Sequence, residues 1–225
     1  INIGINGTGR IGRAIFRRAL ARDDISVKAI NEINPDINNI AYTLNYDTIY
    51  GALEKKIRVD GNFLITPTEQ RIEVLNHSKI DSVDWQKYNV EGVVEATGIK
   101  ANVRAASKLI TNAQCMYVFV THAPGDDVDF TMVLGANHEQ LDRTRHKVIA
   151  TSICDATAIA PVMECLDQEV GIANGQVTTL HPWLNYQNLM DGASSSWSSP
   201  GEIYHHYALG RSAIGNIIPK PTSAM

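Results

Sequence analysis

Two side chains in the last third of the sequence have the chemistry of a nucleophile and its base. Cys154 directly precedes a stretch with helical apolar periodicity, and a thiol at a helix N-terminus is activated because the helix dipole stabilises the thiolate. His181 ends an alternating segment, residues 176–181, which predicts a strand. A helix and a returning strand could bring both groups to one edge. We therefore interpret Cys154 as a nucleophile and His181 as its base.

The alternative for any single cysteine is a buried, inert thiol. We give that interpretation to Cys115, at the start of a predicted strand, and to Cys165, inside the predicted helix. No metal site is predicted, because the sequence offers no cysteine and histidine cluster with the spacing of metal ligands.

A second group of residues, near the start of the sequence, fits the binding of a dinucleotide. Gly7, Gly9 and Gly12 form a Gly-x-Gly-x-x-Gly pattern between an apolar strand and a helical stretch. The first glycine permits a tight turn, the second lets the backbone approach a pyrophosphate, and the third lets helix and strand pack closely. The helix N-terminus adds unpaired N–H groups and the positive end of its dipole. The alternative is a glycine-rich turn in an unrelated α/β domain.

A carboxylate stands where such a site needs one. Glu32 follows Gly12 by 20 residues, at the end of the second predicted strand, where it could accept hydrogen bonds from the ribose hydroxyls of the adenosine. The next residue is Ile33, so a ribose 2′-phosphate would meet a negative charge without a compensating cation. The sequence therefore predicts NAD as the cofactor, in preference to NADP.

The elements that must position these residues alternate along the chain. Strand-like and helix-like segments follow one another from residue 1 and again from residue 92, which is typical of parallel βαβ units. Residues 56–75 have hairpin chemistry around Asp60-Gly61, and the serine-rich residues 194–199 predict a loop. The predicted fold class is α/β: a Rossmann-type, mostly parallel sheet domain at residues 1–153, followed by part of an α+β catalytic domain at residues 154–225.

Composition narrows the classes of function. The 225 residues carry 20 Lys and Arg against 24 Asp and Glu, so the sequence predicts neither a nucleic-acid partner nor a membrane surface. No apolar run approaches the length of a membrane span. Three cysteines, an odd number, favour a reducing compartment, and we expect the cytoplasm.

Further motifs occur in a fixed order around these residues. They are Asn31-Glu32, Glu95-x-Thr97-Gly98, Gly135-x-Asn137-His138-Glu139, Ala160-Pro161 after Cys154, Thr178-Thr179-Leu180-His181, Gly210-Arg211 and Asn216-Ile217-Ile218-Pro219. With them, the whole chain resembles the phosphorylating glyceraldehyde-3-phosphate dehydrogenase family, which includes erythrose-4-phosphate dehydrogenase.

The resemblance implies a mechanism and a set of binding residues. Cys154 would add to an aldehyde while His181 takes up the hydroxyl proton, hydride would pass to NAD, and inorganic phosphate would cleave the resulting thioester. The product would be 1,3-bisphosphoglycerate when the aldehyde is D-glyceraldehyde 3-phosphate, and the assembly would be a homotetramer. The residues implied for NAD are Gly7, Gly9, Arg10, Ile11, Gly12, Glu32, Ser78, Thr97, Gly98 and Thr121, and those for phosphate are Arg211, Thr222 and Ser223.

The sequence departs from the family's pattern mainly in the substrate half. Ile153 and Asp155 flank Cys154 where the family has hydroxyl residues, Leu184 and Tyr186 replace two threonines that help to bind phosphate, and Thr8 replaces an aromatic residue. Asp155 would repel a thiolate and an incoming phosphate. We therefore expect cofactor binding and acylation to be retained and phosphate recognition to be altered.

Several alternatives stay open at this point. The altered pocket also fits an erythrose-4-phosphate dehydrogenase or another aldehyde dehydrogenase, and a noncatalytic NAD-binding or thiol-sensing homologue is possible. The family's second phosphate-binding arginine and the asparagine that orients the nicotinamide carboxamide have no counterpart before Met225. We therefore expect the sequence to be a C-terminally incomplete family member, and the alternative is a naturally short one.

Overall fold

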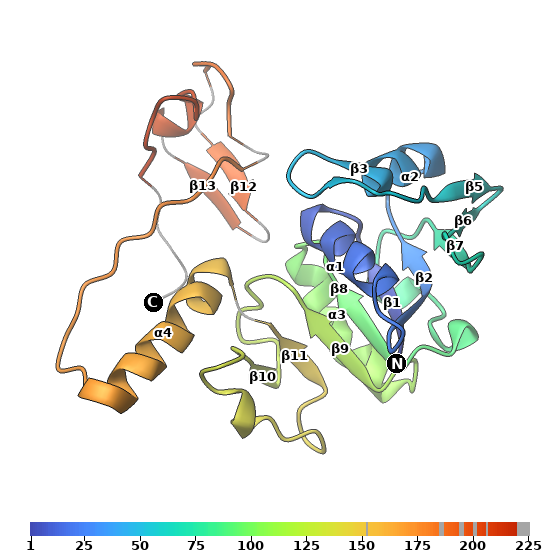
Figure 1. Cartoon of the computed structure of the whole chain (residues 1–225), viewed down its shortest axis with the longest axis horizontal. Coiled ribbons are helices and arrows are strands. Elements are labelled where there is room, and N and C mark those ends of the chain that lie inside the picture. The colour runs from blue at the N-terminus through green and yellow to red at the C-terminus, as the bar shows by residue number, and fades with distance from the viewer. Residues whose placement is uncertain (152, 185–186, 194–195, 200–201, 206, 220–225) are drawn as a thin grey trace. The chain divides into compact units, whose positions relative to one another are not determined.

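The computed structural model describes the chain except residues 152, 185–186, 194–195, 200–201, 206 and 220–225 (Figure 1). The chain forms two compact units. The first contains Ile1–Met132 and Gln140–Thr151, and the second contains Val133–Glu139 and Ser152–Met225.

The first unit is built on a nine-stranded sheet with the order β10-β11-β9-β8-β1-β2-β7-β6-β5. The strands from β10 to β7 pair in parallel, whereas β5, β6 and β7 pair antiparallel. Their bounds are β1 Asn2–Asn6, β2 Ser26–Asn31, β5 Arg58–Asp60, β6 Phe63–Ile65, β7 Arg71–Leu75, β8 Gly92–Glu95, β9 Tyr117–Val120, β10 Phe130–Thr131 and β11 Val148–Ala150. A small separate hairpin joins β3, Tyr46–Asp47, to β4, Gly51–Ala52.

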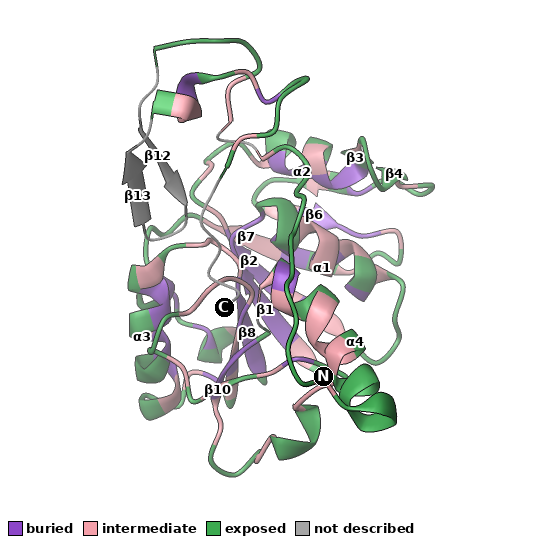
Figure 2. Cartoon of the chain, turned by 90° about the vertical axis from the view of Figure 1, so that its left-hand side faces the viewer, coloured by how far each residue is buried: buried purple, intermediate pink, exposed green. Residues whose placement is uncertain are grey.

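Apolar residues on both faces of this sheet are covered. The helices are α1 Arg10–Leu20, α2 Ile37–Asn45 and α3 Lys100–Thr111, with the short 3-10 helices η1 Ile80–Ser82 and η2 Gln86–Tyr88. Phe16 of α1 and Leu44 of α2 belong to one apolar cluster with Ile5 of β1. Leu109 of α3 belongs to a second cluster with Val93 of β8. Figure 2 shows the buried strands in purple.

The order of the strands defines one special position at the sheet edge. β1 lies between β2 and β8. The crossover through α1 leads from β1 to β2, and the crossover through α3 leads from β8 to β9, so the two run in opposite directions along the sheet. In open α/β sheets, ligands bind at the carboxyl ends of the strands where the direction reverses. The Gly7 to Gly12 loop follows directly on β1, so the fold places it at that position.

The second unit is held together by fewer elements. It contains α4, Cys154–Val170, the hairpin of β12, Ser196–Ser199, and β13, Glu202–His205, and the 3-10 helix η4, Tyr207–Gly210. A further 3-10 helix, η3, spans His138–Gln140, where the chain passes from the residues of the second unit to those of the first. Asp155 is the one buried residue of α4. Within the described residues, no helix has the length and apolar character needed to cross a bilayer.

The predicted α/β class with a mostly parallel sheet is confirmed, and so is the antiparallel hairpin after residue 56. Two local predictions are wrong. Residues 176–181 do not form a strand, because no strand in the described part of the chain pairs with them and an unpaired extended segment leaves its backbone groups to water. Residues 196–199 form β12, because β13 supplies that pairing; the remaining two residues of the predicted loop, 194 and 195, lie outside the described residues.

Candidate active site

The glycine loop combines two tightly packed glycines with one that borders open space. Gly7 has φ of +95°, and its N–H donates to Asn31 O at 2.8 Å. A Cβ on Gly12 would lie 2.0 Å from Gly7 O, so only glycine allows α1 to begin this close to the loop. A Cβ on Gly9 would meet no atom nearer than Ala96 O at 3.8 Å. The backbone at Gly9 can therefore be approached by another molecule.

Glu32 is held against this loop by Thr8. The N–H and Oγ1 of Thr8 donate to Glu32 Oε2 at 2.6 and 2.7 Å, and Asn34 N donates to Oε1 at 3.0 Å. Partial burial raises the pKa of Glu32, but the hydrogen bonds from Thr8 and Asn34 outweigh it, so the pKa lies below its usual value. The carboxylate is therefore ionised at neutral pH and fixed beside the first two glycines.

A row of buried polar side chains runs beneath the loop. Asn6 at the end of β1 donates to Glu95 Oε2, and Asn31 Nδ2 donates to Asn6 Oδ1 at 2.6 Å. His77 N donates in turn to Asn31 Oδ1 at 2.8 Å. His122 Nε2 lies 3.8 Å from Glu95 Oε1 and has no hydrogen-bond partner within the described part of the chain. This row links β8, β1 and β2 at the edge where the loop lies.

Arg10 and Ile11 are the first two residues of α1, and both are exposed. Arg10 Nη1 pairs with Asp47 Oδ2 at 2.9 Å, and its guanidinium lies 5.4 Å from the centre of the Tyr50 ring. Arg10 thus lies at the N-terminus of α1 beside the loop, and its contacts with Asp47 and Tyr50 orient its side chain.

The other residues implied for the cofactor lie at the carboxyl ends of β7, β8 and β9. Thr97 N donates to Glu95 Oε1 at 2.8 Å, and Gly98 has φ of +76°. Thr121 N donates to Glu95 O at 3.1 Å. Ser78 is exposed in the segment after β7. All of these positions share the sheet edge with the glycine loop, because these strands are parallel to β1.

In the second unit, one carboxylate oxygen joins the predicted nucleophile and base. Cys154 is the first residue of α4, and its Sγ donates to Asp155 Oδ1 at 3.7 Å. His181 Nε2 lies 2.7 Å from the same Oδ1. The ligand atoms of all three side chains lie within 4.8 Å of one another. The structure therefore brings Cys154 and His181 together, with Asp155 between them.

The other two cysteines differ from each other. Cys115 is buried, and burial raises its pKa to about 11, which agrees with an inert thiol. Cys165 is exposed on α4, so the expectation that it is buried is wrong. The periodicity of α4 indicated a covered face, but the apolar residues Val162 and Leu166 are exposed as well.

The residues expected around phosphate are described only in part. Arg211 Nε pairs with Asp191 Oδ1 at 3.1 Å on the surface. Leu184 is partly buried, and its N–H donates to Gln187 Oε1 at 2.8 Å. Tyr186, Thr222 and Ser223 lie outside the described residues.

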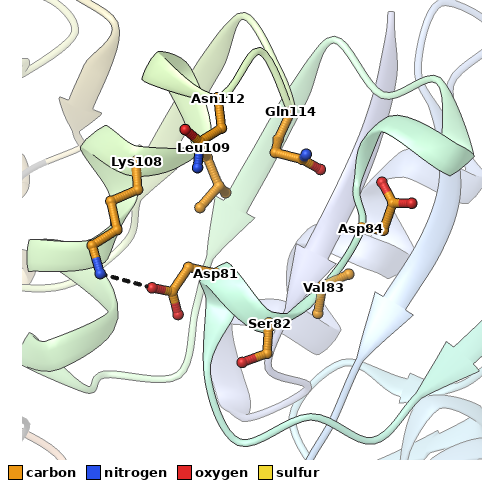
Figure 3. Close-up of a pocket in the computed structure, with 8 residues that line it drawn as sticks. All are labelled: Asp81, Ser82, Val83, Asp84, Lys108, Leu109, Asn112 and Gln114. Carbon is orange, nitrogen blue, oxygen red and sulfur yellow. Dashed lines mark hydrogen bonds and ion pairs between the residues drawn. The ribbon is translucent and has the colours of Figure 1, made fainter.

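The first unit contains cavities at opposite edges of its sheet. One of about 230 Å³ is lined by the polar side chains of Asp81 and Lys108, which pair at 3.0 Å (Figure 3). It lies at the C-terminal end of α3, the sheet edge opposite the glycine loop, so it does not belong to the loop site. A second cavity of about 310 Å³ is lined by Asn34, Leu75 and Asn76, which follow or end β2 and β7 at the edge that carries Glu32.

Two protein-family models match the chain, one over the part with the glycine loop and one over the part with Cys154. Residues 1–103 match the model "Glyceraldehyde 3-phosphate dehydrogenase, NAD binding domain", and residues 153–225 match "Glyceraldehyde 3-phosphate dehydrogenase, C-terminal domain". The chain belongs to the glyceraldehyde-3-phosphate dehydrogenase family. Both the loop site and the Cys154 site fall within the matched residues.

Curated members of the glyceraldehyde-3-phosphate dehydrogenase family are similar along the whole chain. The proteins from Priestia megaterium and Bacillus subtilis (strain 168), the latter named glyceraldehyde-3-phosphate dehydrogenase 1, are each 35% identical over 224 residues, which is 100% of this chain. The protein from Geobacillus stearothermophilus is 35% identical over 191 residues, 85% of the chain. The chain spans 63% of the length of the first two relatives.

Sequence reasoning missed two features of these sites. It treated Asn31 and Glu95 as parts of motifs and did not predict their buried hydrogen bonds with Asn6, although a polar residue at the end of an apolar strand was a visible signal. It also did not predict that the Asp155 carboxylate contacts both other groups, with Oδ1 3.7 Å from Cys154 Sγ and 2.7 Å from His181 Nε2.

Proposed function

We propose that this chain takes part in the NAD-dependent oxidation of an aldehyde, D-glyceraldehyde 3-phosphate to 1,3-bisphosphoglycerate, through a thioester on Cys154. The observation that carries the proposal is the meeting of Cys154, Asp155 and His181 at the start of α4. It adds a nucleophile and a base to a chain whose first unit has a dinucleotide loop.

The loop residues fit NAD. The open backbone at Gly9 and the unpaired N–H groups of the first turn of α1 would hold the pyrophosphate. Glu32 would accept hydrogen bonds from the ribose hydroxyls, and the cavity beside Asn34 and Asn76 has the size of a small-molecule site. We propose the remaining contacts for Arg10, Ile11, Ser78, Thr97, Gly98 and Thr121. When bound, the nicotinamide accepts the hydride of the aldehyde.

Cys154 and His181 would carry out the covalent chemistry. The Cys154 sulfur attacks the carbonyl carbon, forming the C–S bond of a hemithioacetal, and His181 takes the proton of the new hydroxyl group as hydride leaves. The carbon is thereby oxidised to a thioester. Attack by inorganic phosphate then breaks the C–S bond, releases an acyl phosphate and restores the sulfur. Asp155 positions His181 within reach of the sulfur, because its Oδ1 lies 2.7 Å from Nε2.

Phosphate binding is the altered part of this proposal. Asp155 places a carboxylate next to the reacting sulfur, where an incoming phosphate dianion is repelled. The exposed Arg211 pairs with Asp191. We propose Arg211, with Thr222 and Ser223, as phosphate ligands, and we expect a weaker interaction with inorganic phosphate than a hydroxyl residue at position 155 would allow.

The same group of side chains is compatible with two alternative functions. An aldehyde dehydrogenase that acts on erythrose 4-phosphate or another aldehyde would use the same sulfur and imidazole with a different pocket. A noncatalytic NAD-binding or thiol-sensing protein would keep the loop and the reactive thiol and lack turnover.

One assay separates these functions. NADH absorbance is followed with a panel of aldehydes, with and without phosphate, for the chain and for Cys154→Ser. We expect NADH formation that falls by at least about 10³-fold in the variant, because serine is a much weaker nucleophile at neutral pH. NAD binding without turnover in any condition would overturn the enzyme in favour of the noncatalytic homologue.

Three further statements belong to the same proposal. The functional division would fall at residue 153, with NAD binding before it and catalysis from Cys154 onward. The assembly would be a homotetramer, which sedimentation analysis of the full-length protein tests. The compartment would be the cytoplasm, which fractionation tests.

A further inference from the structure

The second unit gathers three side chains of the types that bind transition metals. Cys154, Asp155 and His181 offer a sulfur, a carboxylate oxygen and an imidazole nitrogen within 4.8 Å of one another. Cys154 and Asp155 are adjacent at the start of α4, and His181 comes from a segment 26 residues beyond Asp155. The cluster combines a local pair with a distant third member, as in many metal sites.

The distances are close to those of a tetrahedral zinc site. With usual zinc–ligand bond lengths, nitrogen and oxygen ligands lie about 3.3 Å apart, and sulfur and oxygen about 3.5 Å apart. Here Nε2 and Oδ1 are 2.7 Å apart and Sγ and Oδ1 are 3.7 Å apart. A change of about 0.6 Å in the first distance would accommodate the metal. His181 is partly exposed and its segment pairs with no strand of the described chain, so it can make that change.

The charges and the chemical softness of the three ligands favour zinc over harder divalent cations. A thiolate and a carboxylate together neutralise a divalent cation, and thiolate with imidazole prefers zinc to the harder magnesium or calcium. Three protein ligands leave a fourth position for water. On binding, Cys154 loses its thiol proton to solvent, and His181 binds through Nε2 as the neutral imidazole whose single N–H is on Nδ1.

We propose that Cys154, Asp155 and His181 form a zinc site that reversibly blocks the thiol. Asp155 supplies the third ligand, because without its carboxylate only the Cys154 sulfur and the His181 imidazole of this cluster would remain. Metal-bound sulfur is not available for attack on a carbonyl carbon. The metal binding does not depend on aldehyde oxidation, whereas the block presupposes the proposed function.

Cobalt titration tests the site directly. The metal-free chain, kept reduced without added thiols, is titrated with Co²⁺, and the thiolate-to-cobalt absorption band in the near ultraviolet is followed; Zn²⁺ then displaces the cobalt. We expect one cobalt per chain with this band, no band in Cys154→Ser, and an affinity lower by about tenfold or more in Asp155→Thr and His181→Gln.

Cys165→Ser is the matched control, because Cys165 is also an exposed cysteine of α4. It should bind cobalt as the unchanged chain does. Circular dichroism establishes that each variant is folded, and Asp155→Thr and His181→Gln keep the test valid if Cys154→Ser is not. Absence of the band in the unchanged chain, its persistence in Cys154→Ser, or its loss in Cys165→Ser would overturn the site.

The same samples separate this proposal from the proposed function. A metal-free chain that forms NADH but binds no cobalt would defeat the zinc site alone. A chain that binds cobalt through Cys154 but oxidises no aldehyde would defeat the proposed function alone. Where both hold, added Zn²⁺ should suppress NADH formation, and a chelator should restore it.

Discussion

The two candidate sites are positioned in different ways. The glycine loop continues a central strand of a sheet that is covered on both faces, and buried Asn6, Asn31 and Glu95 tie its neighbours together. Cys154 begins a helix whose one buried residue is Asp155. In the first unit, packing holds the site. In the second, one carboxylate oxygen connects the reactive groups.

This contrast separates what packing and polar contacts can do. Close packing at the sheet edge fixes the backbone of the glycine loop, because many strands and helices share the apolar cores beside it. A polar bridge between exposed side chains fixes only the atoms it touches, and one substitution can change it. The following predictions test the contrast, beginning with the largest effect.

Core substitutions should distinguish the two units. Leu109 of α3 is 1% exposed, whereas Leu166 of α4 is 46% exposed. We expect Leu109→Ala to lower the free energy of unfolding by about 2–5 kcal/mol through lost burial and a cavity. Leu166→Ala should lower it by less than about 1 kcal/mol. Urea unfolding followed by circular dichroism measures both, and equal losses would show that the α4 face is covered.

The reactivity of the Cys154 and Cys115 thiols should differ between the two units as well. Burial raises the pKa of Cys115 to about 11, so roughly one thiol in a thousand is ionised at pH 8. We expect iodoacetamide to modify Cys154 about 10²-fold faster than Cys115 at this pH. Peptide mass spectrometry over time gives both rates. The Cys115 rate should rise with pH up to about 11.

Cys165 is the internal control for that experiment, because it is exposed but lies away from the N-terminus of α4. If Cys154 reacts no faster than Cys165, exposure alone explains its reactivity, and the contribution of the helix start and of His181 is excluded.

Asp155→Thr should sharpen the role of the polar bridge. Removing this carboxylate takes a negative charge out of the path of phosphate, and we expect the KM for inorganic phosphate to fall about tenfold. Steady-state NADH assays over a phosphate series measure it. Glu169→Gln removes an exposed charge from the last turn of the same helix and should leave this KM unchanged.

Thr8→Val should produce the smallest effect. It removes the hydroxyl bond to Glu32 Oε2 while the backbone bond remains. The folded pKa of Glu32 lies below its ordinary value of 4.5, so its stabilising contribution is present above that value and is lost as pH falls through the lowered pKa. At pH 7 we expect a loss of about 0.5–1 kcal/mol, reduced by solvent screening.

Urea unfolding at a series of pH values measures the Thr8→Val effect, which should shrink in acid. Thr111→Val provides the comparison, because the Thr111 hydroxyl donates to the Ser107 carbonyl and to no ionisable group. A Thr8→Val effect as independent of pH as that of Thr111→Val would contradict the link between Thr8 and the charge of Glu32.

Local chemistry in the sequence was enough to predict the parallel sheet, the loop and the acid that follows it. Gly12 is required because a Cβ would collide with Gly7 O, and such steric demands repeat wherever this turn occurs. The alternation of residues 176–181 led to a wrong strand prediction. A strand also needs a pairing partner, and the periodicity of one segment does not show whether such a partner exists.

Residue type and spacing along the chain therefore specified the architecture and pointed to a candidate nucleophile, because backbone sterics and helical or strand periods act between neighbours. Only the fold decided which atoms meet. Thr8 reaches Glu32 across 24 residues, and the oxygen of Asp155 serves both Cys154 and a histidine far along the chain. Such encounters depend on how whole elements pack, so only the tertiary structure shows that the Asp155 carboxylate contacts both the candidate nucleophile and the candidate base.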